Sequence, residues 1–238
     1  MIHSFFLNAA KNGRKTIQFV EPYLWDDEFE QRFYTANYKN VTKDNNTHPH
    51  LYACCFSSVK KSYAAWKVFA DNTKKEEGLC VKILIDRKKF SKQLCKFESR
   101  SYKVYEGLVD YSLSDEAILH LHERNWANGN PNFYHDIFFN KKFELATYLS
   151  LLLIKRDIFD YEEELRYFLI PTSPKKDNKI YPEIDWGYVI KDVEVDIHYP
   201  NDKFYELRKF CYNEFGKSFL VHKVDLNSMP GGGITIQK

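Results

Sequence analysis

The stretch DYEEELRYFL, residues 160–169, carries three glutamates and an arginine among aromatic and aliphatic residues. In a strand, alternate side chains share a face, which would put Glu162, Glu164 and Arg166 on one side. Two carboxylates beside a guanidinium and apolar groups can tune a pKa or hold an acceptor for chemistry. Lys155 precedes them and adds a second cation. The alternative is a solvated sheet face on which Arg166 pairs with Glu164 or a cross-strand neighbour.

A hydroxyl group stands at the end of another predicted strand. CCFSS, residues 54–58, follows an apolar run, and Ser57 is a candidate site residue because of that position. The two cysteines before it are interpreted as small hydrophobic residues rather than nucleophiles. The chain contains neither a GxSxG elbow nor an HExxH motif.

Histidine spacing gives little support to a metal centre. His48 with His50, and His120 with His122, are two residues apart, a spacing that forms a clamp on a strand. The second pair falls on a predicted helix, where such side chains point apart. Local spacing supplies no third ligand, so we predict no metal site.

The bulk composition is that of a globular protein. Of the 238 residues, 44% are hydrophobic and 17% aromatic, which is enough for a packed core. A net charge of +2 neither indicates nor excludes nucleic acid as a partner. The five cysteines form no CxxC pair, and the longest apolar run, 145–154, is too short to span a membrane. We expect a cytoplasmic protein with free thiols and no membrane association; other partners stay open.

Strands and helices alternate irregularly along the chain. The patterns predict strands over residues 16–22, 51–57, 78–86, 103–111, 160–169, 186–199 and 219–226, and helices over 4–12, 26–38, 62–72 and 202–215. A helical block runs from residue 115 to 155. This order favours an α+β fold with a mixed or antiparallel sheet and a helical middle block. No linker or repeat divides it, so residues 1–238 are predicted to form a single domain.

Three stretches together resemble a bacterial family, the domain of unknown function 2971. They are FVEPYLWDDEFE at 19–30, the segment 55–83, and KRDIFDYEEELR at 155–166. The positions that match the family pattern are Phe19, Pro22, Asp27, Phe29, Glu30, Ser57, Trp66, Ala70, Gly78, Cys80, Lys155, Tyr161, Glu162, Glu164 and Arg166. VDY at 109–111 also fits. The likeness covers nearly the whole chain.

Two features depart from that family. Its members begin with a short aromatic and basic strand before the first helix, and this chain starts at that helix. We therefore expect the strand to be missing, lost or supplied by another start site. Val68 stands where the family has histidine, which removes a titratable group. Relatives resemble components of phage-defence and abortive-infection loci.

The layout of this resemblance is similar to that of ADP-ribosyltransferases, which consume NAD. By this analogy Glu164 stabilises the positive charge that develops as nicotinamide leaves, and Glu162 orients the acceptor. Ser57 would line the nicotinamide-ribose pocket, and Trp66 or Tyr161 would stack on the nicotinamide. NAD is then the expected cofactor, although the residues alone do not identify one.

A metal-dependent hydrolase of nucleic acids is an alternative interpretation. In that case Asp27, Glu162 and Glu164 would gather a divalent ion, and Lys155 would contact a phosphate.

A non-catalytic sensor or scaffold of a defence system is the third interpretation. Arg166 would then be held by Asp27 or Glu30, with Trp66 packed beneath. All three interpretations place residues 26–30, the Ser57 strand end and the Glu-x-Glu-x-Arg face in one site. They fail if Glu162 and Glu164 face open solvent far from Asp27 and Ser57.

Overall fold

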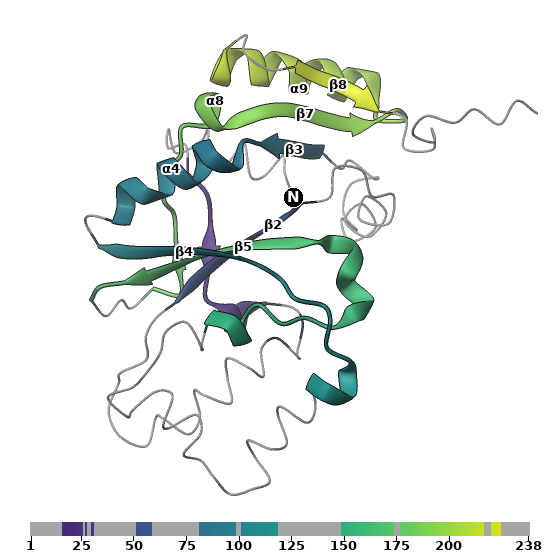
Figure 1. The fold of residues 1–238 in the computed structure, drawn as a ribbon. Coiled ribbons are helices and arrows are strands. Elements are labelled where there is room, and N and C mark those ends of the chain that lie inside the picture. The colour runs from purple at the N-terminus through teal and green to yellow at the C-terminus, as the bar shows by residue number, and fades with distance from the viewer. Residues whose placement is uncertain are drawn as a thin grey trace, which may run out of the picture. The chain divides into compact units, whose positions relative to one another are not determined.

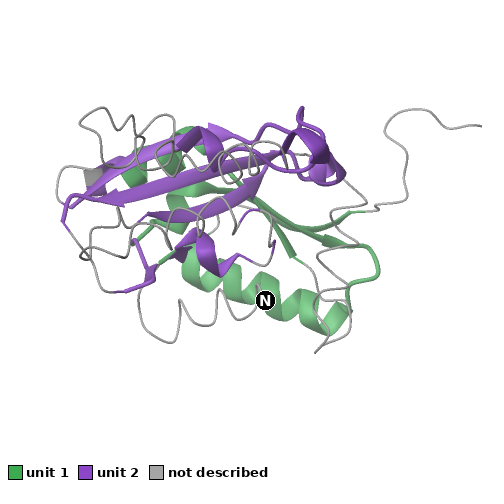
Figure 2. Ribbon diagram, turned by 90° about the horizontal axis from the view of Figure 1, so that it is seen from below, with its two compact units in different colours: residues 1–17, 60–94, 183–238 green, residues 18–59, 95–182 purple. Residues whose placement is uncertain are grey.

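The computed structural model describes residues 16–25, 27, 30, 51–58, 81–98, 101–118, 149–173, 177–216 and 220–224 (Figure 1). The chain divides into two compact units, shown in green and purple in Figure 2. Unit 1 comprises residues 1–17, 60–94 and 183–238, and unit 2 comprises residues 18–59 and 95–182. No single cut of the chain separates them, because each unit consists of more than one segment.

Unit 2 is built on a five-stranded antiparallel sheet with the order β4-β5-β2-β1-β6 (Figure 1). Its strands are β1 (Phe19–Val20), β2 (Tyr52–Ser57), β4 (Tyr102–Leu108), β5 (Glu164–Pro171) and β6 (Lys179–Ile180). Two 3-10 helices, η1 (Pro22–Leu24) and η2 (Asp157–Glu162), also belong to this unit. The long central strands β2 and β5 carry the core and, at one end, the candidate site residues.

The core of unit 2 lies against one face of this sheet. Burying a large apolar side chain stabilises a fold by about 1.5–3 kcal/mol. The buried cluster consists of Leu51, Ala53, Leu149, Leu152, Phe168 and Ile170. Phe168 and Ile170 share their strand face with Arg166, so this face changes from apolar to charged along β5.

Small residues flank Arg166 on both neighbouring strands. Gly107 of β4 and Cys55 of β2 are its register partners. A Cβ atom added at Gly107 would lie 2.3 Å from Leu153 Cδ1, because the Leu153 side chain packs directly over this glycine. The glycine thus lets the segment that contains Leu152 and Leu153 approach the sheet where Arg166 emerges.

Unit 1 contains a three-stranded sheet with the order β3-β7-β8. Strand β3 (Val81–Ile85) pairs antiparallel with β7 (Ile190–Asp196), and β7 pairs parallel with β8 (Leu220–Val224). A parallel pair needs a crossover, which α9 (Asn201–Phe215) supplies while packing against β8 (Figure 1). Helix α9 ends at Gly216, whose φ of 83° favours glycine. The division between the units falls within α4 (Arg87–Glu98).

The α+β class with antiparallel and mixed sheets is confirmed. Strands lie within the predicted ranges 16–22, 51–57, 78–86 and 219–226, and helix α9 matches 202–215 closely. Residues 115–118 and 149–151 of the predicted helical block are helical. The rest of that block, residues 119–148, and the helices predicted over 4–12 and 62–72 lie outside the described residues. The assignment of residues 1–238 to one domain stays a prediction.

Two strand predictions are wrong at their beginnings. Residues 160–162 belong to η2, and β5 starts only at Glu164. Residues 186–189 form the one-turn helix α8 (Trp186–Val189), because the Asp185 side chain caps it by accepting from Tyr188 N. Helix α4 was not predicted at all. In the part of the chain that the structure describes, no helix is long and apolar enough to cross a membrane.

The close packing over Gly107 can be tested by a double-mutant cycle. We expect Gly107→Ala to lower the free energy of unfolding by about 1–3 kcal/mol, because the new methyl group overlaps Leu153. In a Leu153→Ala background the same substitution should cost much less, since the overlapping atoms are gone. Urea unfolding of the four proteins measures both effects. Equal costs in the two backgrounds would contradict this packing.

Candidate functional site

Arg166 is the most deeply buried charge of the candidate site, with 1% of its side chain exposed. Its Nε donates to Glu164 Oε2 at 2.7 Å and its Nη1 to the Leu152 carbonyl at 2.6 Å. Its Nη2 donates to Glu30 in a very short ion pair. The guanidinium also lies over the Trp25 ring, 4.5 Å from the centroid, in a cation–π contact. Every side of this guanidinium is therefore matched by carboxylate, carbonyl or aromatic groups.

Lys155 is the second buried cation, and it links the two candidate catalytic glutamates. Its Nζ lies 2.5 Å from Glu162 Oε2 and 3.0 Å from Glu164 Oε1. The ammonium also lies 4.7 Å from the centroid of the Phe159 ring. Glu164 consequently uses one oxygen for Lys155 and the other for Arg166. About one eighth of each glutamate side chain is exposed, 12% in both cases.

The segment that follows β4 places these groups. Val109 N donates to the Glu164 carbonyl at 2.9 Å, and Asp110 pairs with the chain on either side of Ile154, through Leu153 O and Lys155 N. The Tyr111 hydroxyl accepts a hydrogen bond from Glu164 N at 3.0 Å. Burial raises the pKa of Tyr111 to about 12, so the phenol is neutral. One short segment thus fixes the backbones of both Lys155 and Glu164.

A left-handed turn separates the two glutamates. Glu163 ends η2 with φ 40° and ψ 58°, a conformation that is unfavourable for residues other than glycine, asparagine and aspartate. The two serines at the end of β2 hold this turn. Ser57 Oγ donates to the Glu162 carbonyl at 2.6 Å, and Ser58 N donates to the Glu163 carbonyl at 2.8 Å. The turn allows Glu162 and Glu164 to converge on Lys155 although only Glu164 is on the strand.

Asp27 joins the edge of the cluster through Arg156. Arg156 Nη2 lies 3.4 Å from Asp27 Oδ2, and the guanidinium carbon is 5.1 Å from the centroid of the Phe159 ring. Tyr161 lies in η2 beside Glu162; burial and this carboxylate raise its pKa. Asp27 is thus linked to Arg156, and Tyr161 lies next to Glu162.

The surroundings push the pKa values of the two glutamates apart. Burial raises the pKa of Glu164, but Arg166 and Lys155 outweigh it, so the pKa is lowered and the group is ionised. Burial and the hydrogen bond with Glu164 raise the pKa of Glu162 despite Lys155. Burial also raises the pKa of Glu30, against the effect of Arg166. Two cations thus serve three carboxyl groups, of which Glu164 has a lowered pKa and Glu162 and Glu30 have raised ones.

The cysteines beside the site are poor nucleophiles. Burial raises the pKa of the Cys54 thiol to about 12. The pKa of Cys55 is also well above its usual range, because the protein around it desolvates the thiol even though part of the residue reaches solvent. Both thiols are protonated near neutral pH, which agrees with their interpretation as small hydrophobic residues.

The structure brings most of the predicted site residues together. One region of unit 2 contains seven of them: Glu162, Glu164, Arg166, Lys155, Ser57, Asp27 and Tyr161. The interpretation of Glu162 as a strand residue is wrong, since the η2 turn rather than strand alternation directs it to Lys155. Trp66 lies outside the described residues, and so do His48, His50, His120 and His122.

The contact between Arg166 and Glu30 is one that the scaffold interpretation predicted. Sequence reasoning missed Trp25 and Tyr111. Trp25 contacts Arg166 directly, and it belongs to the stretch that matched the family pattern, which was the available signal. Tyr111 belongs to the VDY segment, which matched that pattern but carried no predicted role.

A divalent ion finds no vacant place between the two glutamates, because the Lys155 ammonium lies there. Among the described residues, the group of ligand atoms close enough to hold an ion is Asp192, Glu194 and His222, in unit 1. This arrangement gives no support to the set Asp27, Glu162 and Glu164 as a metal centre.

Comparison of the chain with protein-family models, with curated proteins and with solved structures found no match. The resemblance to the domain of unknown function 2971 therefore stays a prediction from the residues quoted above.

The Arg166–Glu30 pair should be strongly coupled. Arg166→Met leaves Glu30 without its Arg166 partner, and Glu30→Leu removes one of the two carboxylates that Arg166 binds. Because each substitution disrupts a buried ion pair, we expect each to cost about 3–5 kcal/mol of unfolding free energy. The double variant should cost less than the sum. Lys203→Met, which removes an exposed pair with Glu206 in α9, is the control and should cost less than about 1 kcal/mol. Additive costs in urea unfolding would argue against the pair.

Removing Lys155 should change how the glutamates titrate. Lys155 lowers the pKa of both, so Lys155→Met should raise both values, as followed by carboxyl-carbon NMR. The lowered pKa of Glu164 contributes stability above its ordinary value of 4.5, and this is lost as pH falls through the lowered pKa. The stability gap between wild type and variant should therefore shrink in acid. Exposed Lys103→Met is the control, and unchanged glutamate pKa values in Lys155→Met would contradict the assignment.

Proposed function

We propose that the cluster around Glu164 is the active site of a bacterial, cytoplasmic, NAD-consuming enzyme of the ADP-ribosyltransferase type. The observation that carries the proposal is the register of β2 and β5. Ser57 at the end of β2 stands opposite Glu164 at the start of β5, and Ser57 Oγ binds the Glu162 backbone. This resembles the plan in which a serine-bearing strand supports a Glu-x-Glu pair, except that only Glu164 is on the later strand and Glu162 precedes it in η2.

The electrostatics suit glycosyl transfer. When the bond between nicotinamide nitrogen and ribose carbon breaks, nicotinamide leaves with the bonding electrons and the ribose carbon becomes cationic. Glu164 is held ionised by Arg166 and Lys155, and a fixed carboxylate stabilises such a centre in a site with little water. An acceptor then bonds to that carbon and loses a proton. Glu162, with its raised pKa, is the better base of the pair for orienting the acceptor and taking this proton.

The role of Ser57 in this proposal is to position rather than to contact substrate. Its hydroxyl already donates to the Glu162 carbonyl, so it fixes the turn that aims both glutamates. Tyr161 borders Glu162 and offers an aromatic surface for the nicotinamide ring. By the resemblance described above, we propose that such an enzyme acts in phage defence or as a toxin.

A non-catalytic scaffold is the second candidate, and one observation favours it. Arg166 has 1% of its side chain exposed, and both oxygens of Glu164 are already engaged by cations. A cluster so fully paired can act as a structural element that fixes the relation of β5, Glu30 and Lys155. In that case the same residues sustain the fold and no turnover depends on them.

Nicotinamide release from NAD by the purified protein, with and without bacterial lysate, separates the two candidates. We expect release by the wild type and a loss of at least about 100-fold in Glu164→Gln, because the neutral amide cannot stabilise the cation. The matched control is Glu163→Gln, which changes the exposed glutamate between the two and should keep activity. Urea unfolding of each variant separates lost chemistry from lost structure.

Two outcomes would overturn the proposal. Full activity in Glu164→Gln would remove the role assigned to that residue. A wild type that neither releases nicotinamide nor gains thermal stability from added NAD would favour the scaffold instead.

A further inference from the structure

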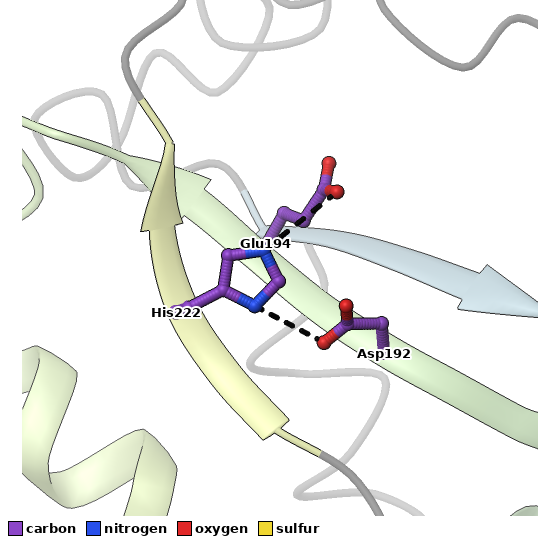
Figure 3. Close-up of side chains that lie close together, drawn as sticks. All are labelled: Asp192, Glu194 and His222. Atoms are coloured by element: carbon purple, nitrogen blue, oxygen red, sulfur yellow. Dashed lines mark ion pairs between the residues drawn. The ribbon is translucent and has the colours of Figure 1, made fainter.

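A second group of chemically active side chains lies on the three-stranded sheet of unit 1. Asp192 and Glu194 are two residues apart on β7 and therefore share a face. His222 of β8 is the register partner of Glu194. Figure 3 shows the imidazole of His222 reaching from its strand toward both carboxylates of the neighbouring strand. Sheet pairing thus brings together two carboxylates and one imidazole.

The distances are those of a compact ligand set. His222 Nδ1 lies 3.2 Å from Asp192 Oδ1, and Nε2 lies 3.9 Å from Glu194 Oε1 (Figure 3). One ligand atom from each residue falls within 4.8 Å of the others. Ligands of a tetrahedral zinc ion with bonds of about 2.0–2.1 Å are roughly 3.3–3.5 Å apart. The separation between His222 Nδ1 and Asp192 Oδ1 already has this size. Since an ion binds a single ring nitrogen, the Glu194 carboxylate has to approach the nitrogen that faces Asp192 to complete the set.

We infer that Asp192, Glu194 and His222 form a binding site for a divalent transition-metal ion, with Zn²⁺ as the best fit. One imidazole nitrogen and two carboxylate oxygens are a mixed set that suits zinc, whereas calcium and magnesium prefer oxygen ligands alone. Three protein ligands leave a fourth position for water. The exposed fractions of 28%, 16% and 41% leave the set within reach of an ion from solution. Local sequence spacing does not indicate this site, because its ligands come from two strands.

A lysine on the third strand competes with the ion. Lys82 of β3 is the register partner of Glu194, and its Nζ lies 3.1 Å from Glu194 Oε2. The alternative to a metal site is therefore a ladder of ion pairs from Lys82 through Glu194 and His222 to Asp192. The two interpretations make opposite demands on Lys82. If the site binds metal, removing Lys82 frees the Glu194 ligand and eliminates a charge that repels the ion. If the ladder of ion pairs is the native arrangement, removing Lys82 only breaks one pair.

The site would join two neighbouring strands. Strand β8 is held to β7 by one parallel ladder, because β8 is the edge of this sheet among the described residues. An ion bound by His222 on β8 and by two carboxylates on β7 would cross-link the two strands and stabilise the edge of the sheet. Binding to the folded state alone stabilises it in proportion to the logarithm of free ion over the dissociation constant.

The test is titration of the full chain with Co²⁺, read by its visible absorption, and with Zn²⁺ in competition. We expect one equivalent to bind without a thiolate charge-transfer band, and Zn²⁺ to displace it. His222→Gln should weaken binding at least about 100-fold, whereas Lys82→Gln should tighten it. His198→Gln, which changes an exposed histidine just beyond β7, is the matched control and should leave binding unchanged. Zn²⁺ should raise the melting temperature of the wild type but not of His222→Gln.

Several results would overturn the proposal. They are unchanged binding in His222→Gln, a thiolate band in the wild type, or no wild-type binding up to about 1 mM ion. Binding by Lys82→Gln but not by the wild type would also overturn it, since the ion-pair ladder would then be the native state. Asp192→Asn is a second ligand variant that should also weaken binding. The test therefore does not depend on whether His222→Gln folds. Urea unfolding confirms that each variant is folded.

Discussion

A guanidinium almost entirely removed from water is the constraint on which unit 2 depends. Desolvating one charge costs several kcal/mol unless the protein replaces the lost water contacts, so Arg166 dictates what surrounds it. Two carboxylates, one backbone carbonyl and one indole ring meet this demand. The small residues Cys55 and Gly107 stand opposite Arg166 on the adjacent strands, and Gly107 leaves room for the Leu153 side chain. Charge pairing, strand register and core packing therefore depend on one another at Arg166.

Lys155 extends that solution toward the exposed edge of the site. It binds Oε1 of Glu164 and Oε2 of Glu162. The pKa of Glu164 is lowered and that of Glu162 is raised, although the two side chains are chemically identical. The left-handed Glu163 makes this asymmetry possible, since it lets one glutamate stay on the strand while the other leaves it. Unfavourable backbone conformations of this kind are often retained where a function needs them. The cluster is thus both a structural junction and a pair of carboxyl groups with distinct proton affinities.

Secondary structure could be predicted from the sequence where the hydrophobic periodicity was regular. The prediction was wrong where long-range contacts determine the local conformation. Strand β2 and helix α9 follow from their patterns, and Gly216 marks the helix end. Residues 160–162 resemble the start of a strand because Tyr161 continues the alternation of Leu165 and Tyr167, yet they end a 3-10 helix in which Glu162 contacts Lys155 and Ser57. Helix α4 was missed because most of RKKFSKQLCKFE is polar. Glu164, Arg166 and Lys155 were found as a motif, whereas Tyr111 was not, since no local pattern links residues 53 positions apart.

The partner of Arg166 has a consequence for how the protein is made. Glu30 lies 136 positions earlier in the chain, and the Ser57 contact with Glu162 spans 105. During synthesis, the Glu30 carboxylate cannot pair with the Arg166 guanidinium until residue 166 has left the ribosome. Closing loops of this size is slow compared with forming local structure, so the buried cluster belongs to the last steps of folding. Until the cluster forms, its charged groups stay hydrated. The incomplete end of the sheet is therefore polar rather than apolar and aggregation-prone.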